Sequence, residues 1–393
     1  MNMRNALLLF KVLAICLLIA GCGGGSTTGI APAGPAQTTV TGVASKGIIK
    51  GGTVKIYAPA ASGDIGGKIL LATTATDNSG RFSAAIGSYK GMVLLEVSGS
   101  LVYTNEATGI KESIGEDAPL RAVVVIDNAG DAEVVTLSPL SELATRKALS
   151  GSFLTENSIR SANTLLSNLF QFDIIAVQPV EPAIPAINAA TQGQRDYTIA
   201  LAAIAKLAAS AGSLSAVLDS FSSDLAATSR LSAGTAIGFR NAAAAFLSDS
   251  AHNQTGMTAL SRALSDFGNY TGVLYLATQG GASAPIGSIQ MTLVLPAGVT
   301  IKKGADGEAM VAVSGAADKA AATGKNYIEP DTLILAIISS PGFALGEFAA
   351  ITYIAEPGVI PVASDFKVTY SKVTGFDGTN DFDLAYTIAP VLR

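Results

Sequence analysis

Residues 52–57 read Gly-Thr-Val-Lys-Ile-Tyr, a short run in which apolar and polar side chains alternate. Because successive side chains of a strand point to opposite faces, this alternation predicts a strand with one buried face. Other runs of strand length, each bounded by a glycine-containing turn, follow at residues 69–72, 82–86 and 92–97. The pattern predicts an antiparallel β-sandwich over residues 38–137.

One turn inside this region has a specific chemistry. Residues 76–80 read Thr-Asp-Asn-Ser-Gly. The side chain of Asp77 or Asn78 can accept hydrogen bonds from nearby backbone N–H groups, and Gly80 can adopt a positive φ. A tight turn is therefore expected before Phe82.

The order of the alternating run at 52–57, this turn and the alternating run at 93–97 resembles carboxypeptidase-regulatory-like domains. These are also called prealbumin-like and include the Cna B-type repeats of surface proteins. The resemblance covers about residues 38–99. It implies a stalk or spacer that in some cases binds sugar, and no catalysis.

Some surface relatives of that family form an amide bond between Lys and Asn, promoted by a buried carboxylate. The resemblance would give such roles to Lys55 and Glu96, although no motif identifies the Asn partner. The alternative is that both side chains are solvated, as charged residues on strands usually are.

The N-terminus carries an export signal. Arg4 and Lys11 give a basic lead, and the apolar run at 12–20 is too short to span a bilayer. Small residues then precede Cys22. The pattern resembles the lipobox of bacterial lipoproteins, which implies that Cys22 is acylated and becomes the mature N-terminus. The alternative is an ordinary cleaved signal with an incidental cysteine.

On the lipoprotein interpretation, residues 1–21 are the signal peptide and residues 22–37 are a flexible tether rich in Gly, Ser, Thr, Ala and Pro. Several acyl chains hold a protein on a membrane more firmly than one chain does. Gly23 stands where an Asp would favour retention in the inner membrane. We therefore expect a cell-envelope protein at the outer membrane of a Gram-negative bacterium.

Composition excludes several classes of function. The net charge is -5, the pI is near 5.0 and the cationic residues are scattered, so nucleic acid is not expected as a partner. On the lipoprotein interpretation Cys16 leaves with the signal peptide and Cys22 carries lipid, so we expect no free thiol in the mature chain for a disulfide, a metal or a nucleophile.

The hydrophobic period changes from strand to helix at residue 138. Pro139 follows Ser138, a favourable way to begin a helix, and Thr155, Ser213 and either Ser232 or Thr235 can cap later helices. Apolar stripes at helical spacing continue to about residue 268, for example at Tyr197, Leu201, Ile204 and Ala208. We predict an Ala-rich helical bundle over 138–268. The stripes fit a buried core, or alternatively a groove for a partner helix.

A second β region runs from residue 271 to residue 393 and completes the predicted fold, two antiparallel β-sandwiches flanking the helical bundle. The runs 289–295, 366–370 and 384–388 alternate, whereas 333–338 is continuously apolar and is predicted to be a central strand. Residues 295–299 (Leu-Pro-Ala-Gly-Val) and 342–348, together with the strand at 350–355, resemble cohesin-type domains, which are related to carbohydrate-binding modules. The resemblance implies a dockerin-like protein or a polysaccharide as partner.

Catalytic motifs are sparse. His252 is the single histidine and lies in a polar stretch, and no Gly-x-Ser-x-Gly motif supplies a nucleophile for a triad. We expect a solvated loop histidine. The sequence contains neither a zinc-ligand pattern nor a phosphate-binding loop that ends in Gly-Lys-Ser/Thr.

The strongest candidate for a metal site is the loop that contains Asp377, Asp381 and Asp383, whose oxygens are spaced as calcium ligands can be. It lacks the sharp-turn glycine and the final Glu of an EF-hand, so a polar hairpin turn is the alternative. No other cofactor is expected. Together these features predict a lipid-anchored envelope protein that binds or scaffolds without catalysis. The alternatives are an envelope hydrolase of carbohydrates that uses a carboxylate pair, and a purely structural spacer.

Overall fold

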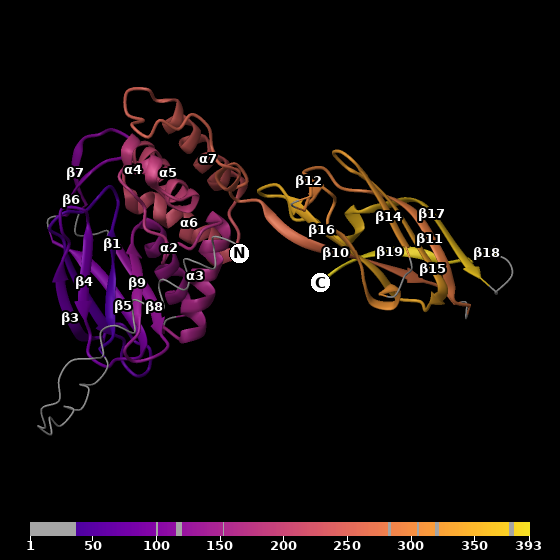
Figure 1. Cartoon of the computed structure of the whole chain (residues 1–393), viewed down its shortest axis with the longest axis horizontal. Coiled ribbons are helices and arrows are strands. Elements are labelled where there is room, and N and C mark those ends of the chain that lie inside the picture. Colours follow the sequence, from indigo (N-terminus) through magenta and orange to yellow (C-terminus); the bar gives the residue numbers. More distant parts are fainter. Residues whose placement is uncertain are drawn as a thin grey trace, which may run out of the picture. The chain divides into compact units, whose positions relative to one another are not determined.

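The computed structural model describes residues 37–393 except 100, 115–119, 152, 282–283, 305, 319–321 and 377–380. The signal peptide, Cys22 and nearly all of the tether predicted from the sequence lie outside the described residues. Within them the chain forms several β-sheets and seven α-helices, so the predicted mixed β and α character is confirmed (Figure 1).

Two sheets form the first part of the described chain. One has the order β4 (Arg81–Ala85), β1 (Thr39–Ala44), β9 (Ala132–Leu137). The other has the order β3 (Ile69–Ala75), β2 (Thr53–Ala58), β5 (Gly91–Ser98), β8 (Leu120–Ile126). The turn before β4 forms as predicted: Asp77 Oδ1 accepts the N–H groups of Ser79 and Arg81 at 2.7 and 2.9 Å, and Gly80 has φ +73°.

The prediction of wholly antiparallel pairing in this region is wrong. β1 and β9 run parallel, with Val40 opposite Glu133 and Val43 opposite Thr136. Parallel neighbours need a long crossover connection. Here the strands between them in the sequence, including the whole four-stranded sheet, form that crossover. An alternating pattern fixes which face of a strand is buried but not the direction of its neighbour.

Helices cover the second face of β5 and β8. Helix α2 (Pro139–Ala148) begins at Ser138, whose side chain accepts the N–H groups of Leu140 and Ser141. A short 3-10 turn, η2 (Leu149–Gly151), leads to α3 (Glu156–Phe170), which Thr155 caps. Leu94 and Val123 pack there with Ala148, Ile159 and Ala162. The neighbouring side chains Val93 and Leu95 belong to the main core, so β5 is buried on both faces.

The remaining helices are α4 (Ile184–Ala189), α5 (Gln192–Ala211), α6 (Leu214–Thr228), α7 (Ala233–Ser248) and α8 (Arg262–Ser265). Ser213 caps α6, as the sequence predicts, and of the two candidates Ser232 and Thr235 it is Ser232 that caps α7. Every residue of α5 from 196 to 205 is buried, rather than the single stripe that the sequence indicated. A helix that is buried all round packs inside a core.

One apolar core joins these sheets and helices. The cluster includes Val40 and Ile56 on the sheets, Leu140 on α2 and Ile204 on α5. Among the described helices, none is by itself long and apolar enough to cross a membrane; α5 and α6 meet those criteria only as a pair bent by 106°.

A two-stranded hairpin follows β5 in the first part of the chain. β6 (Leu101–Thr104) and β7 (Lys111–Ile114) pair with each other, with Tyr103 opposite Glu112. Within the described residues this pair forms its own sheet and shares no ladder with the other strands.

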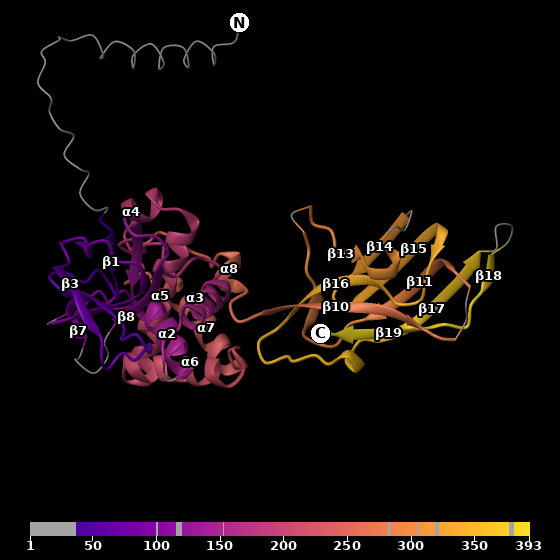
Figure 2. The same ribbon diagram turned by 90° about the horizontal axis from the view of Figure 1, so that it is seen from below.

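The last part of the chain contains two five-stranded sheets (Figure 2). The first consists of β10 (Tyr270–Gln279), β12 (Val299–Ile301), β13 (Val311–Val313), β16 (Glu347–Ala355) and β19 (Thr387–Leu392). The second has the order β14 (Ala322–Ile328), β15 (Thr332–Phe343), β11 (Ile286–Val294), β17 (Lys367–Phe376), β18 (Asp381–Asp383). Short 3-10 turns, η3 (Gly315–Ala317) and η4 (Ala363–Asp365), lie in the connections.

Side chains from both of these sheets form a second apolar core, which includes Met291 and Leu335 from one sheet and Phe348 and Ile351 from the other. β15 lies between β14 and β11, so its predicted interior position in a sheet is confirmed. Its continuous apolar run is not buried on both faces, however. Leu333, Leu335 and Ile337 point into the core, whereas Ile338 is 55% exposed.

Candidate functional site

The outward face of the sheet that contains β15 is the candidate binding surface. The strand register places Ile338, Ser288 and Thr374 in one row across β15, β11 and β17. The next rows contain Ala336, Gln290 and Lys372, and then Ile334, Thr292 and Tyr370. We call these nine side chains the open face.

Most of the open face is uncharged. β11 and β15 contain no Asp, Glu, Lys or Arg. The hydroxyl groups of Ser288 and Thr374 form a hydrogen bond of 2.7 Å. Tyr370 and Ile338 are the large hydrophobic side chains of this face that are exposed, at 48% and 55%. The surface offers hydroxyl and amide groups around a few apolar side chains.

Among the nine side chains of the open face, Lys372 on β17 is the charged one. Lys372 Nζ lies 3.3 Å from Asp383 Oδ1 on β18, and both side chains are more than half exposed. An ion pair so exposed contributes little to stability.

The proposed calcium loop falls largely outside the described residues. Asp377 lies in the segment that the structure does not describe, and of Asp381 only the backbone is described. Asp383 is described and faces Lys372. In the described part of the chain no three His, Cys, Asp or Glu side chains come together as a metal site.

His252 lies in the loop after α7, where the sequence places it. Its Nδ1 is 3.0 Å from Asp249 Oδ2, which also accepts a hydrogen bond from Lys206 Nζ at 2.7 Å. The hydrogen bond from Lys206, with the one from His252, holds the pKa of Asp249 well below its usual range. The group joins the end of α7 to α5.

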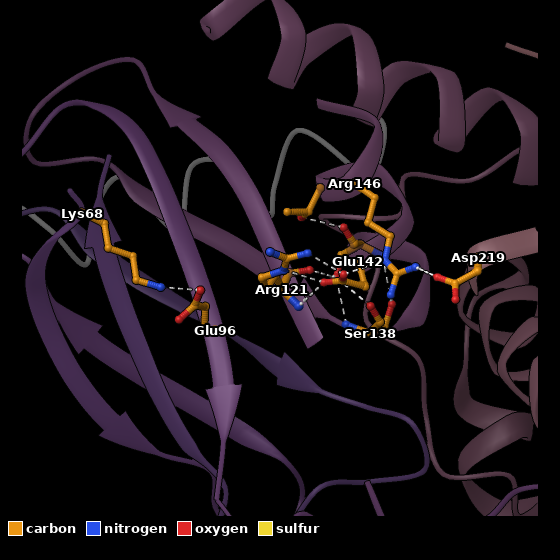
Figure 3. A network of polar contacts seen from close by, with 9 residues as sticks. Lys68, Glu96, Arg121, Ser138, Glu142, Arg146 and Asp219 are labelled. Atoms are coloured by element: carbon orange, nitrogen blue, oxygen red, sulfur yellow. Dashed lines mark hydrogen bonds and ion pairs between the residues drawn. The ribbon is translucent and has the colours of Figure 1, made fainter. Parts of the chain in front are cut away.

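Glu96 and Lys55 lie directly opposite each other in the register of β5 and β2. The carboxylate of Glu96 accepts its hydrogen bond from another lysine, Lys68, at 2.6 Å (Figure 3). Lys68 Nζ also lies 4.4 Å from the centre of the Tyr57 ring. The structure therefore pairs Glu96 with Lys68, which the sequence analysis did not single out.

Arg121 of β8 lies opposite Glu96 in the strand register and binds a more deeply buried carboxylate, that of Glu142. Glu142 of α2 has a fully buried side chain and contacts both Arg121 and Arg146 (Figure 3). Hydrogen bonding to Glu142 is the main cause that raises the pKa of Arg121, so this arginine stays charged. The network connects the sheet to the helices.

A second buried charge pair, Lys46 and Glu106, was also missed from the sequence. Their side chains are 1% and 2% exposed, and Nζ lies 3.7 Å from Oε2. Lys46 stands in a Ser-Lys-Gly turn and Glu106 in a polar loop, both of which look solvated in the sequence. The glycine after Lys46 was the one available signal of close backbone packing.

Comparisons with known proteins give little beyond this geometry. No known protein family and no curated protein matches the sequence. Solved structures that show some similarity include a non-cellulosomal cohesin from Archaeoglobus fulgidus, at 12% identity and a TM-score of 0.21, over 32% of this chain and 81% of the cohesin. The full-length major pilin SpaD from Corynebacterium diphtheriae aligns at 8% identity and a TM-score of 0.16, over 91% of this chain and 67% of the pilin. A 9R-lipoxygenase from Cyanothece PCC8801 aligns at 11% identity and a TM-score of 0.17, over 59% of this chain and 30% of the enzyme.

Proposed function

We propose that this chain is a lipid-anchored protein of the cell envelope that binds or scaffolds a ligand without catalysis. The anchor is the acylated Cys22, and the ligand-binding surface is the open face. The ligand is a dockerin-like protein or a polysaccharide, and the location is the outer membrane of a Gram-negative bacterium.

The sequence around Cys22 supports the anchor. A basic lead, a short apolar run and the small residues Ala20 and Gly21 precede the cysteine, and a tether without apolar periodicity follows it. A tether of that kind gives a folded part freedom to reach ligands away from the membrane surface.

The observation that carries the binding proposal is the exposure of Ile338 on an interior strand of a largely uncharged sheet face. Interior strands usually alternate between apolar side chains toward the core and polar side chains toward water. Here β15 places Ile334, Ala336 and Ile338 on the outer face as well. Exposed apolar patches that lie among polar residues commonly mark interaction sites.

The test compares two substitutions of matched exposure in the full mature chain. Ile338→Glu puts a charge on the open face, whereas Ile184→Glu puts the same charge on α4, where Ile184 is 53% exposed. Binding to cell-envelope polysaccharide and to partners crosslinked on intact cells is measured for both. Saturable binding that Ile338→Glu removes and Ile184→Glu retains supports the proposal.

Other outcomes of this test reject the proposal. Equal binding by both variants shows that the open face is not the binding surface. Release of soluble sugar from the polysaccharide, lost on substitution of a carboxylate, shows that the chain is a hydrolase.

A further inference from the structure

The β6–β7 hairpin is attached to the rest of the protein mainly through side chains. Its two strands pair with each other, and within the described residues neither one joins the ladders of the neighbouring sheets. An isolated two-stranded hairpin is marginally stable in water. Its attachment therefore depends on the contacts of residues such as Tyr103 and Glu106 with the chain around Lys46.

The backbone approaches the hairpin closely at Gly47. A Cβ at this position would lie 2.0 Å from the carbonyl oxygen of Thr104, and Gly47 has φ +68°. The N–H of Gly47 donates a hydrogen bond to Oε1 of Glu106. Only glycine fits this contact, which places Lys46 directly beneath the hairpin.

The hairpin supplies the partners of the Lys46 ammonium group. Nζ lies 3.7 Å from Glu106 Oε2 and 4.7 Å from the centre of the Tyr103 ring. Burial, followed by the hydrogen bond to Glu112, raises the pKa of Tyr103, so its hydroxyl stays protonated and donates to Glu112 Oε2 at 2.8 Å. Asn105 Nδ2 donates to the other oxygen of Glu112 at 2.9 Å.

The pair is nevertheless incompletely bonded. Among the residues that the structure describes, neither Lys46 Nζ nor Glu106 Oε2, both buried atoms, has a hydrogen-bond partner. A buried ion pair of this kind adds little net stability, but removing one partner leaves the other as an uncompensated buried charge. The closed position of the hairpin is therefore sensitive to the charge of one residue.

We propose that Lys46 and Glu106 form an electrostatic latch that holds the hairpin Leu101–Ile114 closed. Loss of either charge opens the hairpin as a unit, while the two neighbouring sheets stay folded. Opening exposes Tyr103, which belongs to the same apolar cluster as Ile49, and frees the edges of β6 and β7 for a partner strand.

Hydrogen exchange followed by mass spectrometry tests the latch in the full mature chain. Glu106→Gln and Lys46→Met should each raise exchange in residues 101–114 on the order of a hundredfold, with β2, β5 and β8 unchanged. The double variant Lys46→Met and Glu106→Gln removes both charges, keeps a side-chain oxygen to accept the Gly47 N–H group, and should restore protection. The matched control is Lys68→Met with Glu96→Leu, a pair whose side chains are 27% and 21% exposed, which should leave the hairpin unchanged.

Three results overturn the latch. Exchange that rises throughout the chain shows a general stability role, and unchanged exchange in both single variants shows no role. A native mass lower by one water, which is absent from the Glu106→Gln and Lys46→Met variants, shows that the pair is fused as an amide and not held by charge.

Discussion

Glu142 of α2 and Arg121 of β8 form a buried bidentate ion pair. Nε and Nη2 of Arg121 donate to the two carboxylate oxygens at 2.9 and 2.7 Å, and the backbone N–H of Arg121 donates at 3.1 Å. Arg146 donates a further hydrogen bond from Nε at 2.9 Å and reaches Asp219 of α6 through Nη1 at 2.6 Å. One carboxylate thus ties the sheet to two helices.

Substitution of Glu142 should destabilise the protein strongly. Glu142→Gln keeps the shape but leaves Arg121 and Arg146 without their shared anion, which costs about 3–5 kcal/mol when a buried pair loses one partner. Urea unfolding measures the change. The control Glu181→Gln, at an exposed position, should change stability by less than about 0.5 kcal/mol. A loss at Glu142 as small as that of the control would contradict the structural role given to this network.

Asp249 should make stability depend on pH in the acid range. Its folded pKa is lowered, mainly by the hydrogen bond from Lys206, so its contribution is complete above the unfolded value of about 3.9 and is lost as the pH falls toward the folded value. Asp249→Asn should lower the melting temperature at pH 7, and the difference from wild type should shrink below about pH 4. A difference that stays constant down to pH 3 would show that the carboxylate charge is not the cause.

The charge of Glu133 should have the opposite effect on stability from that of Asp249. Desolvation, followed by repulsion from Asp127, Asp131 and Asp173, raises its folded pKa above 4.5. Its ionised form therefore opposes folding at neutral pH, and this opposition disappears as the pH falls below the unfolded value. Glu133→Gln should stabilise the protein at pH 7 by up to about 0.5 kcal/mol and have no effect near pH 4. A variant that is less stable than wild type at pH 7 would refute the argument.

Calcium should leave the melting temperature unchanged. Asp383 faces the ammonium group of Lys372 at 3.3 Å, and that cation competes with a metal for the carboxylate. Thermal unfolding with added calcium and with a chelator provides the measurement. A melting temperature that the chelator lowers in wild type, but not in the Asp381→Asn and Asp383→Asn double variant, would instead establish the calcium loop.

The sequence predicted local structure well and long-range pairing poorly. The Asp77 turn and the caps at Thr155, Ser213 and Ser232 are confirmed because each depends on a few adjacent residues. The parallel pairing of β1 with β9 depends on how the chain crosses between sheets, which no alternating pattern records.

The buried charges were hidden from the sequence for the same reason. Lys46 and Glu106 lie 60 positions apart and become buried only when the hairpin packs on Gly47. The open face could be predicted only in part. The run at 333–338 indicated an interior strand, but it did not indicate that Ile338 would face solvent. Whether Ile338 faces solvent depends on what packs against the outer face of the sheet, and the residues of the strand itself do not encode that.

The lipid on Cys22 is the claim on which the proposed location and role depend most directly. Cells that express the chain are labelled with a radioactive or clickable palmitate, and the wild type is compared with Cys22→Ser. We expect the wild type to carry label and fractionate with membranes, and the variant to lose both properties. Label that persists in the variant, or that never appears in the wild type, would contradict the proposal.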